Sequence, residues 1–97
     1  MIRVSGPQAL PALNAIGGRT PVPRETALRI LRHPLTKAPI DQALVIYFKA
    51  PATETGEDIV EFQFHGGRAI IAAMYEALGS IPGCRLAEPG EFARRAF

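Results

Sequence analysis

The sequence predicts an α+β fold in which a mixed β-sheet carries two to three helices, packed together on one of its faces. Three observations favour this class. Residues 58–65 alternate apolar and polar side chains, as a strand with one buried face does. Residues 43–48 are apolar throughout, which is typical of a strand buried on both faces. Between residues 70 and 78 the apolar side chains recur at helical spacing.

The start of the chain predicts one strand and one helix. Residues 2–4 have strand character, and the turn-forming residues 5–7 stop this strand early. Pro7 suits the first position of a helix, and apolar residues continue at helical spacing to Ile16. Pro11 interrupts that pattern, so we expect the helix to be short or kinked.

The middle of the chain predicts two strands and a loop. Residues 26–32 alternate and read as a half-exposed strand, which His33 and Pro34 end. The apolar run at 43–48 forms the next strand, and residues 52–56 form a loop.

The last part of the chain predicts a strand followed by a helix, and then a short strand followed by the start of another helix. After the strand at 58–65, two glycines turn the chain into a helix that ends at Gly79. Residues 84–87 are expected to form a short strand, and a third helix is expected to begin at residues 89–91. The predicted order is β-α-β-β-β-α-β-α.

Composition limits the classes of protein that are possible. The 97 residues allow one domain, and 47% hydrophobic with 21% charged residues argue against a disordered chain or a fibre. No apolar run approaches the roughly 20 residues that span a bilayer, so we expect no membrane partner. The single cysteine, Cys84, cannot form an internal disulfide, which suits a reducing compartment, and we expect a cytoplasmic location.

The charges are unevenly distributed along the chain. Residues 1–50 hold seven basic and two acidic side chains, a net charge of +5, whereas residues 51–97 hold four basic and seven acidic ones, a net charge of −3. The basic half could approach nucleic acid. No tight basic cluster is present, however, and a solvated basic face is the better explanation of the charges.

Motifs for phosphate binding and for catalysis are missing. Neither G-x-x-x-x-G-K-[ST] nor G-x-G-x-x-G occurs, and no serine stands in a nucleophile elbow. His33 and His65 are too isolated to suggest a metal site, and Cys84 is interpreted as a packed thiol. Residues 66–67 could bring backbone amides to an anion, or could simply form a turn. The sequence therefore predicts no catalytic residue and no metal ligand.

Glu61 is the candidate binding residue that the pattern singles out. It lies in the middle of the predicted strand at 58–65, between Val60 and Phe62. A carboxylate in that position is solvated on an open face, paired with an arginine, or directed toward a ligand with two adjacent N–H donors. Arg3, in the first strand, is similarly either solvent-facing or an anion contact.

Three stretches together resemble a known family. They are Arg3-Val4-Ser5-Gly6-Pro7, then T-G-E-D-I-V-E at 55–61 running on to His65-Gly66-Gly67, and last Pro89-Gly90-Glu91-Phe92 with Arg95-Ala96-Phe97. In this order and spacing they are similar to the N-terminal domain of the tRNA-modification GTPases called MnmE or TrmE. The resemblance covers essentially all 97 residues.

This resemblance implies a fold and a function. The fold is that of the folate-binding domain of the glycine-cleavage T-protein. The implied cofactor is a tetrahydrofolate derivative, 5-formyl- or 5,10-methylene-tetrahydrofolate, contacted at the positions of Arg3 and Glu61. The domain is implied to form a homodimer. With the flavoprotein MnmG, the family modifies the wobble uridine of tRNA at carbon 5, and the folate supplies a one-carbon unit.

The chain also departs from the family pattern. Thr53 and Glu54 stand where the family has a serine and an aromatic residue. The family's domain begins earlier, and a third folate contact, a lysine, falls after Phe97, so we expect residues 1–97 to be a single domain that is incomplete at both ends. The helical domain and the GTPase domain, with its GTP, magnesium and potassium, lie outside this sequence. Whether the chain is an enzyme stays open. The alternative function is an assembly or RNA-contacting module.

Overall fold

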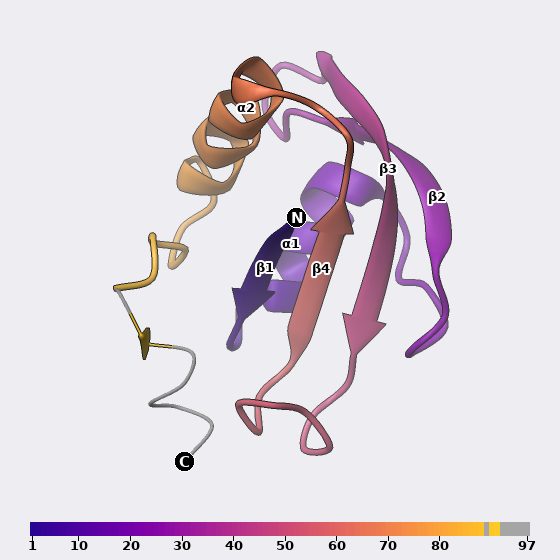
Figure 1. Cartoon of the computed structure of the whole chain (residues 1–97), viewed down its shortest axis with the longest axis vertical. Coiled ribbons are helices and arrows are strands. Elements are labelled where there is room, and N and C mark those ends of the chain that lie inside the picture. Colours follow the sequence, from indigo (N-terminus) through magenta and orange to yellow (C-terminus); the bar gives the residue numbers. More distant parts are fainter. Residues whose placement is uncertain (89, 92–97) are drawn as a thin grey trace.

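The chain folds into one antiparallel sheet with two helices (Figure 1). The structure is a computed structural model that describes residues 1–88, 90 and 91. Its elements, in chain order, are β1 (Ile2–Ser5), α1 (Ala9–Gly17), β2 (Ala27–Arg32), β3 (Pro39–Phe48), β4 (Ile59–Gln63) and α2 (Arg68–Gly79). The predicted α+β class is confirmed.

The strand order across the sheet is β1-β4-β3-β2. All three pairings within the described part of the chain are antiparallel, so the expectation of a mixed sheet is wrong there. The connections explain two of these pairings, those of β3 with β2 and with β4. Residues 33–38 and 49–58 join β2 to β3 and β3 to β4, and such short links join antiparallel neighbours, whereas parallel neighbours need a longer crossover.

One face of the sheet carries the core. Val45 and Tyr47 on β3 are cross-strand partners of Phe62 and Val60 on β4, and all four are buried. Helix α1 contacts all four strands, and Figure 1 shows it lying behind them. Helix α2 adds Met74, Ala77 and Leu78 to the same apolar cluster. Both helices therefore cover one face, as the sequence predicts, and we call the opposite side the open face.

Helix α1 is short, as the sequence predicts: it has nine residues, whereas an average α-helix has about 11–12. Pro11 is its third residue, where the backbone N–H would have no acceptor within the helix. A proline at that position costs no helical hydrogen bond, so the helix continues through it.

The turn between β4 and α2 requires a glycine. A Cβ atom on Gly66 would lie 2.2 Å from Cγ1 of Ile70, in the first turn of α2. The two residues could not both keep their places, so the close approach of the turn to the helix explains the first of the two glycines. A turn therefore accounts for Gly66 without an anion.

Two expectations near the C-terminal end have different outcomes. Residues 84–87 form no strand, so that prediction is wrong. The segment follows a turn at residues 81–83, and it forms no β-pairing with any strand among the described residues. The third helix falls mainly on residue 89 and residues 92–97, which lie outside the described residues. Neither described helix is long and apolar enough to cross a membrane.

Candidate ligand-binding site on the open face

The open face brings the two predicted binding residues together. Arg3 on β1 and Glu61 on β4 are direct cross-strand partners. The Arg3 Nε donates a hydrogen bond to Oε1 of Glu61 at 3.1 Å, and its Nη2 lies 3.0 Å from the same oxygen. Residues that are 58 positions apart in the chain thus form one ion pair.

The environment of Glu61 decides between the three possibilities that the sequence left open. Only 8% of the residue is exposed, and its carboxylate is paired with Arg3, so it is not a solvated surface group. Its second oxygen, Oε2, accepts a hydrogen bond from the Gln63 side-chain amide at 3.2 Å. A carboxylate offers about four lone-pair directions, so three N–H donors from described residues leave room for a donor from a ligand.

A loop at residues 49–58 forms one wall beside this pair. The loop joins β3 to β4 at the lower end of the sheet in Figure 1. The carboxylate of Asp58 accepts a hydrogen bond from the Ala50 N–H at 2.8 Å and another from Tyr47. The hydroxyl of Thr55 lies 2.7 Å from that of Ser5 on β1. These bonds join the two ends of the loop, link Asp58 to Tyr47 on β3 and tie the middle of the loop to β1.

The same loop brings a second carboxylate to Arg3. Oε2 of Glu54 lies 2.9 Å from Nη1 of Arg3, so the guanidinium lies between Glu54 and Glu61. The sequence marked Glu54 only as a departure from a family pattern. Its contact with Arg3 depends on the folding of the loop, and no pattern in the sequence indicates it.

These residues surround a hollow of about 530 Å³. It is lined by Arg3, Arg24, Phe48, Ala52, Thr53, Glu54, Ile59 and Glu61. The Arg24 guanidinium carbon lies 5.4 Å from the centre of the Phe48 ring, a cation–π distance, and Arg24 also donates a hydrogen bond to the Ala52 carbonyl. No pattern in the sequence singles out Arg24, because only the tertiary fold brings residues 20–25 beside this end of the sheet.

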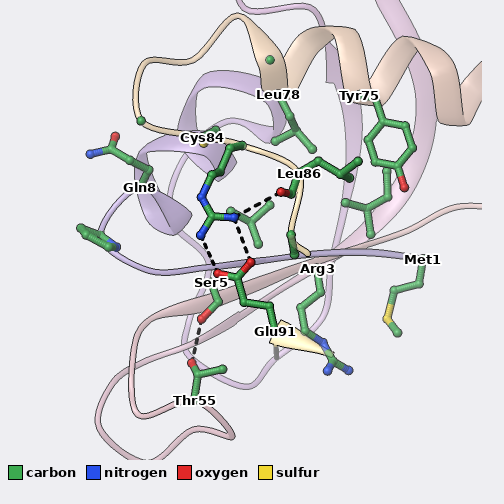
Figure 2. Close-up of a pocket in the computed structure, with 17 residues that line it drawn as sticks. Met1, Arg3, Ser5, Gln8, Thr55, Tyr75, Leu78, Cys84, Leu86 and Glu91 are labelled. Carbon is green, nitrogen blue, oxygen red and sulfur yellow. Dashed lines mark hydrogen bonds and ion pairs between the residues drawn. The ribbon is translucent and has the colours of Figure 1, made fainter. Parts of the chain in front are cut away.

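A larger cavity of about 960 Å³ lies along β1. Figure 2 shows Leu78 and Tyr75 of α2 and Leu86 around it, with Arg3 directed away from the ion pair of Arg85 and Glu91. That pair has two contacts, of 2.9 and 2.6 Å, so the two charged groups satisfy each other. The cavity lacks Glu61, and the smaller hollow is therefore the better candidate site.

The chemical groups outside the hollow include one thiol, that of Cys84. Cys84 lines the larger cavity and packs against the core, and burial raises the pKa of its thiol, which keeps it in the less reactive form. This agrees with its interpretation as a packed thiol. Within residues 1–88, 90 and 91, no three His, Cys, Asp or Glu side chains lie close enough together to hold a metal ion.

Comparison with known proteins identifies the family. The family model described as "GTP-binding protein TrmE N-terminus" matches residues 1–97. The chain is 56% identical over 98 residues to the tRNA modification GTPase MnmE of Parvibaculum lavamentivorans, covering 100% of this chain and 22% of that protein. It is 48% identical over 97 residues to a mitochondrial 5-taurinomethyluridine-[tRNA] synthase subunit of Danio rerio, covering 100% of this chain and 19% of that protein.

The chain thus spans about a fifth of the length of the curated relatives it matches. The match includes the motif from Thr55 to Glu61 and the strand that carries Arg3, so it covers both residues of the ion pair in the hollow. The chain belongs to the family of TrmE N-terminal domains, which form the N-terminal part of the tRNA-modification GTPase MnmE.

Proposed function

We propose that this chain is the tetrahydrofolate-binding and dimerisation module of a tRNA-modification GTPase. One observation carries the proposal: a carboxylate that is only 8% exposed, Glu61, lines a hollow on the open face of the sheet and is paired there with Arg3. Buried charged groups are costly unless they are paired, and they gather at binding sites. The pair is also the one that the family resemblance assigns to folate.

The chemistry of the hollow suits a reduced folate. A pterin ring presents a ring N–H beside an amino group, and one of these donors fits the acceptor direction that Arg3 and Gln63 leave on the Glu61 carboxylate. Arg3 and Arg24 supply positive charge for the carbonyl of the ring or for the carboxylates of the glutamate tail. The volume of about 530 Å³ lies within the range of about 300–1,000 Å³ that is usual for small-molecule sites.

The role of the whole protein follows from its relatives as a proposal. Their names describe a tRNA modification GTPase and a 5-taurinomethyluridine-[tRNA] synthase subunit. We propose that the protein containing this chain acts with MnmG, in the cytoplasm, on carbon 5 of the wobble uridine. The folate bound by this domain would supply the one-carbon unit. GTP, magnesium and potassium would bind in a GTPase domain outside these 97 residues.

Dimerisation is proposed through the open face. Leu28 and Ile30 on β2 and Leu44 on β3 lie on this face and are 62%, 53% and 38% exposed. A row of exposed aliphatic side chains on a small domain indicates a protein contact. A second copy of the chain placed there would also cover the hollow beside Glu61.

Folate binding is tested by calorimetric titration of the chain with 5-formyltetrahydrofolate. Glu61→Gln removes the charge while keeping the shape, and we expect it to weaken binding at least about tenfold, since a hydrogen bond to a charged group contributes about 1.5–3 kcal/mol. Glu76→Gln, on the exposed side of α2, makes the same change in net charge away from the hollow and is expected to bind like the wild type. No binding by the wild type, or equal binding by Glu61→Gln, would contradict the proposal.

A second candidate is an RNA-contacting module. The basic first half of the chain favours it, because Arg19, Arg32 and Lys37 are all exposed. RNA binding through such groups falls steeply with salt, nearly linearly on logarithmic axes. Titration of the chain with tRNA at several salt concentrations tests this candidate, and binding that does not change with salt would exclude it.

A further inference from the structure

We propose that Glu54 is a specificity-determining residue that screens Arg3, so that an anionic ligand group must compete with it for the guanidinium. The inference rests on the proposed function of the open-face hollow. It adds that Glu54 lowers the affinity of this hollow for negatively charged ligand groups. It starts from the position of the Arg3 guanidinium between two carboxylates.

The two carboxylates hold Arg3 in different ways. Oε1 of Glu61, on strand β4, contacts both Nε and Nη2 of Arg3, and the Glu61 side chain is 11% exposed. Oε2 of Glu54, in the loop at residues 49–58, lies 2.9 Å from Nη1 of Arg3, and the Glu54 side chain is 52% exposed. An exposed ion pair contributes little to stability, because water and salt compete with it. The contact with Glu54 is therefore the one that a ligand can displace.

The charge balance of the hollow points the same way. Two arginines, Arg3 and Arg24, face two glutamates, Glu54 and Glu61, among the lining residues. With Glu61 engaged as the acceptor for a ligand's N–H donors, Glu54 cancels charge that would attract carboxylates. Replacing Glu54 by a neutral residue leaves the lining with a net positive charge.

The loop does not need Glu54 to keep its shape. Thr53 donates a hydrogen bond to the Glu57 carbonyl at 2.6 Å, and Thr55 is linked to Ser5 at 2.7 Å. Asp58 holds the Ala50 N–H at the start of the loop. These contacts do not involve the Glu54 side chain, so a substitution at this position changes the charge beside Arg3 while the loop stays in place.

The test compares the wild-type chain with Glu54→Gln and Glu54→Ala, and with Glu76→Gln as the control for net charge. Each is titrated with 5-formyltetrahydrofolate by calorimetry and with inorganic phosphate by NMR, following the Nε–H signal of Arg3. Thermal unfolding confirms that each variant is folded. We expect both Glu54 variants to bind both anions roughly two- to fivefold more tightly, as the loss of one exposed competing ion pair implies.

The outcomes separate this inference from the proposed function. Tighter phosphate binding by the Glu54 variants, with no folate binding by any chain, would support the screening by Glu54 and refute the folate site. Folate and phosphate affinities equal to those of the wild type would overturn the inference while leaving the folate site standing. Weaker binding by the Glu54 variants, or an equal gain in Glu76→Gln, would also overturn it.

Discussion

The two faces of the sheet are built from the same strands but are stabilised by different interactions. On the helix-covered face Val60 and Phe62 are fully buried against α1 and α2. On the open face the alternate residue of the same strand, Glu61, is paired with Arg3, and the aliphatic side chains farther along the sheet are exposed. One face therefore stabilises the domain, and the other is available for contact with a ligand or a partner.

This difference follows from the strand period of two. Neighbouring residues on β4 face opposite sides of the sheet, so a change of one position moves a side chain from the core to the site. Stability and binding can then be altered separately, by substitutions at adjacent positions. The following predictions test how complete that separation is.

The largest effect is expected in the core. Phe62→Ala removes a side chain with no exposed surface, and we expect the free energy of unfolding to fall by about 3–5 kcal/mol, through lost burial and the cavity left behind. Chemical denaturation of the wild type and the variant measures this change.

The matched substitution on the other face is Phe48→Ala. Phe48 is half-buried beside the hollow, where it supports Arg24, and its loss is expected to cost clearly less stability than that of Phe62. Equal losses at the two positions would show that the open face also carries core packing, against the comparison.

An intermediate effect is expected at Tyr47, which links the two faces. Its ring is buried in the core, and its hydroxyl bonds Asp58 at the end of the loop beside the hollow. Burial first, and then the charge of Asp58 and the hydrogen bond to it, raise the pKa of Tyr47 above its usual 10.0. Tyr47→Phe loses that hydrogen bond and is expected to lower the free energy of unfolding by about 0.5–1.5 kcal/mol.

The raised pKa of Tyr47 also predicts a dependence on pH. Above about pH 10 the unfolded chain loses the phenol proton while the folded chain keeps it, so stability falls as the pH rises toward the folded pKa. Tyr47→Phe should flatten this part of the profile of unfolding free energy against pH. An unchanged slope in the variant would show that other groups cause the loss.

Much of the fold could be predicted from local patterns. The alternation in β4, the apolar run within β3 and the helical stripe of α2 each specify their element, because burial on one or two faces leaves a period in the sequence. The prediction of a strand at residues 84–87 was wrong, since four residues are too few to show a period that distinguishes a strand from a coil. The antiparallel pairing depended on short connections rather than on any strand pattern.

The candidate site was less predictable than the fold. Glu61 stood out because its carboxylate lies in the middle of a strand between two apolar residues, and Arg3 was one possible anion contact until the family resemblance assigned both residues to folate. Arg24 and Glu54 lie in loops, where charged residues are ordinary, and only tertiary folding brings them to the hollow. Long-range contacts of this kind leave no spacing signal in a single sequence.

The smallest effect on folding is expected where the open face is most exposed. Leu28 is 62% exposed, so Leu28→Ser removes little buried surface and should change the free energy of unfolding of the isolated subunit by no more than about 0.5 kcal/mol. If the open face forms the proposed homodimer contact, the same substitution should weaken self-association, which sedimentation equilibrium measures over a range of concentrations. Thr36→Ser, in the exposed turn between β2 and β3, provides a control that leaves this face intact. A large loss of subunit stability in Leu28→Ser would mean that the open face belongs to the core, whereas unchanged self-association would place the dimer contact elsewhere.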